Sequence, residues 1–240
     1  MMLALSPKTS TDVARDIEAN GFSFCNARTT SWSGGEADWV EFAATWADLV
    51  EDRYTPQPYV YRSRRFGEFQ LDALTNEATL LPKRTFDQRS EAAQRLYGSL
   101  VRQFAPLAGQ FVADQLQRII ANDLLCFRAD NRTESHWIVG VHQLRVIGRF
   151  DAPGIPTPEG IHSDGYRFVA THLMNFSNGT GGTSTVFAGD GSALASAQLL
   201  TPWDSLFLDD RRVQHFVSPV SAEVGIVVRD VLVIGYELTS

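Results

Sequence analysis

The stretch HWIVGVHQLRVIGRF, residues 136–150, decides the fold class of this 240-residue chain. It is rich in β-branched residues, and its apolar and polar side chains alternate as they do in a β-strand. Stretches of the same character follow it, with Gly, Asn, Asp and Pro in the gaps: YRFVATHLMNF, TSTVFAG, DSLFLDD, QHFVSPV and GIVVRDVLVIGYEL. Because no helical crossover remains to connect parallel neighbours, this half of the chain predicts an antiparallel barrel or sandwich.

The N-terminal half predicts helices instead. The segment 10–22 has an apolar face and a stop at Gly21, and the segment 35–54 carries a second apolar stripe at helical spacing. A further helical pattern runs from Ser90 to about Asn122, where Pro106 is expected to end one helix and open the next.

These halves are expected to form a single domain over residues 1–240, mainly β with flanking helices (α+β). In this arrangement a helical layer packs against a double-sheet β-barrel. About 1–125 would supply helix-rich support and lid elements, and about 126–240 would form the barrel core with any metal site.

Charge and composition limit the possible partners. The net charge is −7, and the only basic cluster, YRSRRFG at 61–67, is too short for a nucleic-acid-binding face, although it could hold one small anion. The N-terminus does not read as a signal peptide, and no apolar stretch approaches membrane-spanning length, so a cytoplasmic protein without a membrane partner is expected. Cys25 and Cys126 have apolar neighbours and are expected to be buried free thiols. A monomer and a homodimer both remain open.

The segment EGIHSDG, residues 159–165, contains the first candidate site. On a strand, residues i and i+2 point to the same face, so His162 and Asp164 can aim at one point. His215, at the start of a later strand-like stretch, would complete two histidines and one carboxylate, the ligand set of non-haem Fe(II) oxygenases. A His-x-Asp pair alone is more often a hydrogen-bonded loop than a metal site.

Arg229 is the second candidate, because it interrupts an otherwise apolar strand where an unpaired guanidinium would be costly. A salt bridge to Asp230 or Asp209 is the structural alternative. Asp230 is a poor partner, since adjacent strand residues face opposite ways. A small dicarboxylate would be a better one, because the planar fork of an arginine grips a carboxylate through two hydrogen bonds.

Together the motifs EGIHSDG, GGTSTVF, HFVSPV and RDVLVI resemble the family of bacterial 2-oxoglutarate/Fe(II) dioxygenases that includes L-isoleucine 4-hydroxylase. The resemblance is collinear over roughly the last hundred residues, and VHQLRVIG upstream fits it as well. It implies a double-stranded β-helix, the cupin-like jelly roll, in which His162, Asp164 and His215 hold iron and Arg229 binds 2-oxoglutarate. The chain departs from the pattern at Thr183, where relatives often carry an acidic residue.

The resemblance also implies a function. The chain would use Fe(II), 2-oxoglutarate and O₂, with ascorbate as a stimulant, to hydroxylate an unactivated C–H bond of a small molecule, most simply a free L-amino acid, and would release succinate and CO₂. One alternative keeps the iron chemistry but acts on a carrier- or peptide-bound residue, or desaturates. Another is a non-catalytic cupin-like protein that binds a metal or a small molecule.

Further candidates are weaker. Gln143 and Arg145 share one strand face, which either meets solvent or points into the barrel mouth. In the second case Gln143, like Thr183, would contact 2-oxoglutarate. An amino-acid substrate needs a cation and an acceptor, and the sequence leaves several residues open for these roles: Arg64, Arg65, Arg145, Arg149, Asp151, Glu159 and Tyr166.

Overall fold

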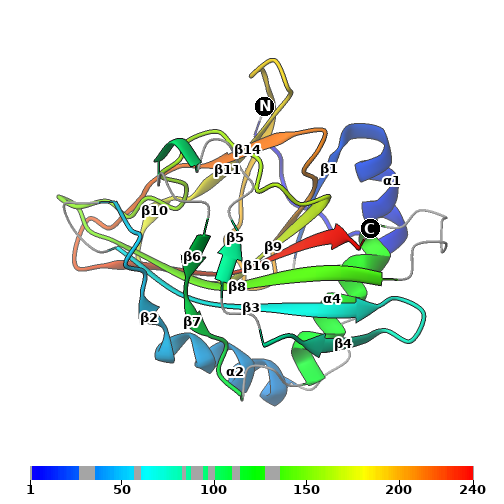
Figure 1. The fold of residues 1–240 in the computed structure, drawn as a ribbon. Helices are drawn as coiled ribbons and strands as arrows, with labels where there is room; N and C mark the ends of the chain where they lie inside the picture. The colour runs from blue at the N-terminus through cyan, green and yellow to red at the C-terminus, as the bar shows by residue number, and fades with distance from the viewer. Residues whose placement is uncertain are drawn as a thin grey trace.

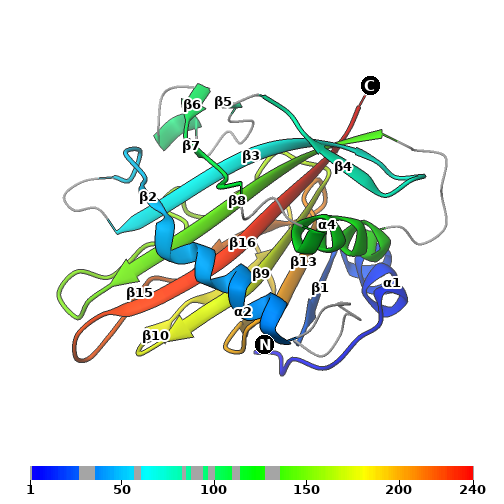
Figure 2. The same ribbon diagram turned by 90° about the horizontal axis from the view of Figure 1, so that it is seen from below.

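Two β-sheets face each other, and helices cover the outer face of the larger sheet (Figures 1 and 2). The arrangement is that of a jelly roll, so the expected double-sheet barrel with a helical layer is confirmed. The computed structural model describes residues 2–26, 36–56, 61–82, 85–87, 94–96, 101–109, 114–127 and 136–239.

The large sheet has the strand order β1-β13-β9-β16-β8-β3-β2, and β4 and β7 pair with β3 outside this path. All its ladders are antiparallel except the short one between β3 and β7. Its strands are β1 (Phe22–Cys25), β2 (Val50–Glu51), β3 (Arg62–Asp72), β4 (Glu77–Leu80), β7 (Ala105–Pro106), β8 (His136–Gly148), β9 (Phe168–Ser177), β13 (Ser205–Asp209) and β16 (Val227–Leu238).

The facing sheet has the order β12-β11-β14, and two short ladders, β10–β15 and β5–β6, complete the barrel. These strands are β5 (Thr85–Asp87), β6 (Val101–Gln103), β10 (Thr180–Gly181), β11 (Thr183–Phe187), β12 (Ala193–Gln198), β14 (Gln214–Val217) and β15 (Val220–Ser221).

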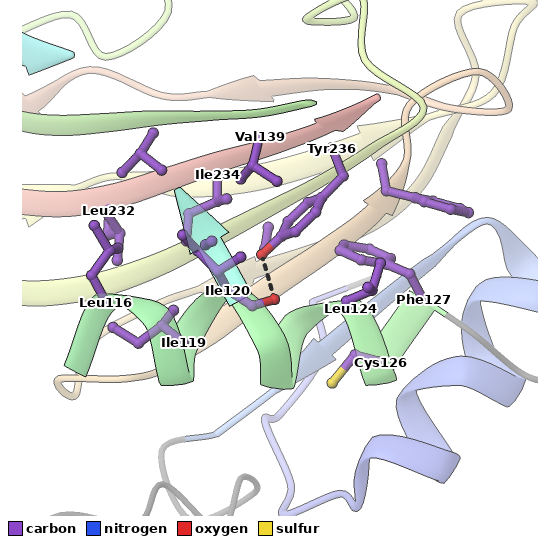
Figure 3. Close-up of a cluster of buried hydrophobic side chains, with 14 of the residues drawn as sticks. Leu116, Ile119, Ile120, Leu124, Cys126, Phe127, Val139, Leu232, Ile234 and Tyr236 are labelled. Atoms are coloured by element: carbon purple, nitrogen blue, oxygen red, sulfur yellow. Dashed lines mark hydrogen bonds between the residues drawn. The ribbon is translucent and has the colours of Figure 1, made fainter. Parts of the chain in front are cut away.

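The helical layer consists of α1 (Ser10–Asn20), α2 (Glu36–Ala44), the short 3₁₀ helix η1 (Thr45–Asp48) and α4 (Asp114–Phe127). Helix α4 lays an apolar face on the outer side of β16 and β8 (Figure 3). In that contact the Tyr236 hydroxyl donates to the Ile120 carbonyl oxygen at 3.1 Å. As expected, Gly21 ends α1 with a left-handed φ of 82°.

The first half of the chain contains more strand than the sequence pattern indicates. The long strand β3 lies inside the large sheet, next to β8, and was not anticipated. The prediction of helix from Ser90 to Asn122 is wrong at β6 and β7, where the chain forms strands. Pro106 pairs in β7 instead of opening a helix. The segments 88–93, 97–100 and 110–113 lie outside the described residues.

Side chains alternate between the two faces of the large sheet. On β16, Arg229 and Val231 point into the barrel, whereas Leu232 points toward the helices. Neighbouring strands keep this alternation, because Arg229 pairs with Val146 of β8, which in turn pairs with Arg62 of β3. Strands β16, β8 and β3 therefore form one continuous inner wall, and every second residue on them faces the pocket.

A tyrosine packs on this wall above two glycines. Gly140 of β8 and Gly235 of β16 are direct partners in the ladder, and a Cβ on Gly235 would lie 2.3 Å from Cδ2 of Tyr166. We expect Gly235→Ala to lower the free energy of unfolding by about 1–3 kcal/mol, because the ring has to move. Gly189→Ala, in the β11–β12 turn with no atom near its Cβ, is the control and should change it by less than about 0.5 kcal/mol in the same denaturant titration.

Candidate metal centre

His162 and His215 are brought together by backbone pairing. The loop after β8 forms an isolated bridge with β14, in which the His162 N–H donates to the His215 carbonyl at 3.0 Å and the His215 N–H donates to the His162 carbonyl at 2.8 Å. Residues paired in this way project to the same side of the ladder. The two imidazole rings accordingly lie with their centroids 4.3 Å apart.

Asp164 adds a carboxylate to this pair. Its Oδ1 lies 3.5 Å from Nε2 of His162, and its Oδ2 lies 3.7 Å from Nε2 of His215. One ligand atom from each of the three residues falls within 4.8 Å of the others. Both histidines are buried, whereas the Asp164 side chain is 26% exposed, so the cluster opens on the side of the carboxylate.

Neighbouring groups hold these side chains in place. Nδ1 of His162 is 2.9 Å from the Gly160 carbonyl oxygen, so Nδ1 carries the proton and Nε2 is left to face the cluster. The Asp210 carboxylate accepts backbone N–H groups from Asp164, Gly165 and Tyr166 at 3.1, 2.7 and 3.2 Å. Asp210, which sequence reasoning missed, thereby fixes the turn that carries Asp164.

The electrostatics of the cluster favour a cation at its centre. Burial lowers the pKa of His162, but the hydrogen bond and charge of Asp164 outweigh it and raise this pKa to about 9. Burial and the charge of His162 lower the pKa of His215 to about 4. The pKa of Asp164 lies well below its usual value despite burial, because both histidines stabilise the carboxylate. An ionised acid between two imidazoles, one of which takes up a proton, suits a divalent metal in place of that proton.

The donor set fits one class of metal in particular. Two imidazole nitrogens and one carboxylate oxygen on one side of an ion leave the other positions open to small molecules, which is the arrangement of non-haem Fe(II) oxygenases. The residues present could therefore hold Fe(II) with free coordination positions toward the pocket.

Arg229 lies in the same pocket and is 2% exposed. Among the described residues its Nε and Nη2 have no hydrogen-bond partner, and burial lowers its pKa to about 10, so it stays charged at neutral pH. Asp230 is not its partner, because that carboxylate binds Arg145 on the other face of the sheet. Gly182 lies beside the guanidinium, since a Cβ there would be 3.4 Å from Nε of Arg229, an ordinary contact distance. A buried charge of this kind calls for an anionic ligand.

The pocket is open to solvent in part, and the empty space inside it, about 840 Å³, includes that open volume. Its walls include both imidazoles and Asp164 at one side and Arg229 at another. The other lining residues include charged, polar and aromatic side chains, among them Arg62, Arg64, Phe86, Arg102, His142, Thr157, Glu159 and Ser184.

The structure places Gln143 and Arg145 away from this pocket. Both lie on the outer face of β8, where Nε2 of Gln143 donates to Oγ1 of Thr45 at 2.8 Å and Arg145 makes two hydrogen bonds to Asp230. The inner face of β8 carries His142 in their stead. The interpretation that Gln143 and Arg145 point into the barrel mouth is therefore wrong.

Four other candidates also miss the pocket. Thr183 starts β11, where the next residue, Ser184, is the one that lines the pocket. Arg149 and Asp151 are exposed in the loop after β8, and Tyr166 is buried against the two glycines of the inner wall. Of the remaining candidates, Arg64 and Glu159 do line the pocket, and Arg65 lies on the opposite face of β3 with Asp48. Arg62 was anticipated only as a member of the basic cluster 61–67, and Arg102 was not anticipated.

Comparison with known proteins adds the family. Residues 43–235 match the family described as 2OG-Fe dioxygenase. L-Isoleucine-4-hydroxylase from Bacillus thuringiensis is 28% identical over 144 residues, a match that covers 58% of this chain and 60% of that protein. The matched part thus spans less than two thirds of the curated relative.

Solved structures are similar over most of their length. IDO from Bacillus thuringiensis aligns with a TM-score of 0.78 at 19% identity, covering 96% of this chain and 100% of the other. A bsmA homolog from Methylobium petroleophilum PM1 aligns with a TM-score of 0.81 at 26% identity, covering 97% and 94%. Across the described ranges, none of the helices has the length and apolar character needed to cross a bilayer.

Proposed function

Because this chain belongs to the 2OG-Fe dioxygenase family, we propose that it catalyses the Fe(II)- and 2-oxoglutarate-dependent hydroxylation of a free L-amino acid. In the overall reaction the substrate C–H bond, 2-oxoglutarate and O₂ give the C–OH product, succinate and CO₂. The observation that carries the proposal is the convergence of His162, Asp164 and His215 within 4.8 Å, in a pocket that also contains the charged Arg229.

Each group then has a definite task. His162, Asp164 and His215 would hold Fe(II), which with bound 2-oxoglutarate supplies the oxidising chemistry. Arg229 would bind the far carboxylate of 2-oxoglutarate through its fork of N–H donors. Burial of His162, His215 and Arg229 would keep bulk water from these groups, which would help to protect the chain from its own oxidant.

An amino acid as substrate is supported by the kind of chemistry in the pocket and by one relative. The pocket carries cationic groups, such as Arg64, together with Glu159, whose Oε2 is buried without a hydrogen-bond partner among the described residues. A zwitterion needs both charges. The relative from Bacillus thuringiensis is named for an amino-acid hydroxylase.

A screen of free L-amino acids tests the function. The protein is incubated with Fe(II), ascorbate, 2-oxoglutarate and each amino acid, starting with L-isoleucine, and succinate and product mass are measured. We expect one or a few amino acids to stimulate succinate formation and to gain one oxygen. Loss of two hydrogens would indicate desaturation, and succinate formed only with peptide- or carrier-bound residues would replace the free substrate. Absence of any 2-oxoglutarate turnover would leave a binding protein.

Ligand binding should also stabilise the fold. With Fe(II) and a non-reactive 2-oxoglutarate analogue at about 100 times its Kd, we expect about 2.7 kcal/mol of extra stability, because only the folded chain has the site. For a chain of this size that corresponds to a rise in Tm of about 5–10 °C. Differential scanning calorimetry measures it. The increment due to the analogue should disappear in Arg229→Gln while the increment due to Fe(II) alone remains, and an equal shift in both proteins would argue against the assigned pocket.

A further inference from the structure

A second cationic wall faces the pocket, separate from Arg229. Arg62 and Arg64 of β3 and Arg102 of β6 all line it. In the ladder, Arg229 pairs with Val146, and Val146 pairs with Arg62. The two basic groups thus stand two strand spacings apart, or about 9–10 Å between backbones. A single short dicarboxylate that contacts both Arg229 and the metal would therefore leave the second basic group unoccupied.

The cationic wall is held in a fixed arrangement. The fully buried Asp52 carboxylate lies 2.7 Å from Nε of Arg62 and 3.4 Å from Nε of Arg64, so it helps to hold both arginine side chains in place. The Arg64 guanidinium stacks over the Phe104 ring at 4.5 Å. Stacking uses the face of a guanidinium, whereas its N–H donors lie in the plane of the group.

Arg102 lies near the same aromatic ring. Its guanidinium lies 5.4 Å from the centre of the Phe104 ring and 5.3 Å from that of Phe86. Arg64 and Arg102 therefore share the Phe104 ring, and both are more than nine-tenths buried. Neighbouring His142 adds no charge, because burial and the Arg64 charge hold its pKa well below the usual value.

Such a pair of stacked guanidinium groups matches a carboxylate, which arginine binds in a planar, two-pronged manner. We propose that Arg64 and Arg102 form the subsite that binds the carboxylate of the substrate. This proposal rests on the proposed function and deepens it: the enzyme selects free acids over amides, esters and residues within a peptide. Arg62 and Asp52 are positioning residues that keep the Arg64 side chain in place.

The test is a binding experiment without turnover. Under anaerobic conditions, with Fe(II) and 2-oxoglutarate present, free L-amino acids and the corresponding L-amino acid amides are titrated into the full-length protein by isothermal titration calorimetry. For the amino acid that binds, we expect the acid to bind about 30- to 100-fold more tightly than its amide, the scale on which a buried charge pair contributes to binding.

Variants assign this preference to the two arginines. Arg64→Gln and Arg102→Gln should weaken binding of the acid by about 30- to 100-fold and leave binding of the amide and of 2-oxoglutarate unchanged. The matched control is Arg65→Gln, the next residue on β3, which faces the other way and binds Asp48 at 2.9 Å. It should bind acid and amide like the parent protein. Arg64→Lys and Arg102→Lys, which keep the positive charge at each position, cover the case that a glutamine variant fails to fold and should show an intermediate loss.

Three outcomes would overturn the proposal. They are an acid preference that persists in the variants, a loss of 2-oxoglutarate affinity in place of acid affinity, and no free amino acid bound more tightly than its amide by the parent protein. None of these outcomes decides whether the chain turns over 2-oxoglutarate, because succinate formation is measured in a separate assay. The third outcome would also count against a free amino acid as the substrate.

Discussion

Asp164→Ala is expected to abolish Fe(II)-dependent 2-oxoglutarate turnover, with a fall of about 10³-fold or more. Asp164 is the acidic member of the cluster, and its carboxylate lies within 4 Å of Nε2 of both His162 and His215. Its removal leaves two imidazoles to hold a doubly charged ion, and the metal's contribution of several kcal/mol to the barrier is lost with it. His215→Ala should have a similar effect, because it leaves one imidazole and one carboxylate to hold the ion.

The fold should survive this change. The Asp164 carboxylate contacts the two histidines, whereas the backbone N–H of Asp164 is held independently by Asp210. Circular dichroism and Tm of the metal-free variant should match the parent protein closely, while titration with Fe(II) should show weakened binding. Asp190→Ala, an exposed carboxylate in the β11–β12 turn, is the control and should keep full turnover. Full activity in Asp164→Ala would refute the metal site.

The pairing of His162 with Asp164 could be predicted from their spacing, although the structure does not place them on the strand that this spacing assumes. His162 forms an isolated bridge with His215, and Asp164 lies in the turn that Asp210 fixes, so tertiary contacts bring the two side chains together. Strand alternation correctly separates Arg229 from Asp230, which ends in a different layer with Arg145. A pattern of strands without crossovers likewise indicates an antiparallel barrel or sandwich.

Which face of a strand meets the pocket could not be predicted. Both faces of β8 are buried, the inner one against the barrel pocket and the outer one under η1 and α4, so alternation identifies two faces without distinguishing them. Gln143 donates a hydrogen bond to Thr45 under the helical layer, although the two residues lie far apart in the sequence. Local periodicity carries no information about such a partner.

Of the cationic wall only Arg64 was among the candidate substrate residues, and the wall as a whole escaped prediction for a related reason. In RSRRFGEFQ the residues Arg62 and Arg64 look like a solvated basic cluster, because Asp52, which neutralises part of their charge, comes from a separate segment. Arg102 sits in a stretch whose local spacing favours helix, yet it forms a strand paired with β5. Tertiary pairing overrides such weak local preferences.

Arg229→Met is expected to raise the concentration of 2-oxoglutarate needed for half-maximal turnover by about 30-fold or more. Removing the charged partner of a buried carboxylate costs about 2–5 kcal/mol, and methionine keeps most of the side-chain volume without any donor. The affinity for Fe(II) should stay unchanged, because Arg229 is not one of the three residues that would bind the metal. Steady-state kinetics with varied 2-oxoglutarate, together with Fe(II) titration, measures both effects.

The same variant should not lower the stability of the ligand-free protein. Without 2-oxoglutarate, Nε and Nη2 of Arg229 lack hydrogen-bond partners among the described residues, so the folded state bears the cost of a desolvated charge. Replacing it by methionine should leave Tm equal or raise it while co-substrate binding collapses. Arg145→Gln, one register position away on the outer face, should instead lower Tm, because Asp230 loses its partner, and should leave the 2-oxoglutarate requirement unchanged. If both arginine variants lost stability and kept their 2-oxoglutarate affinity, Arg229 would be a structural cation and another group would have to bind the co-substrate.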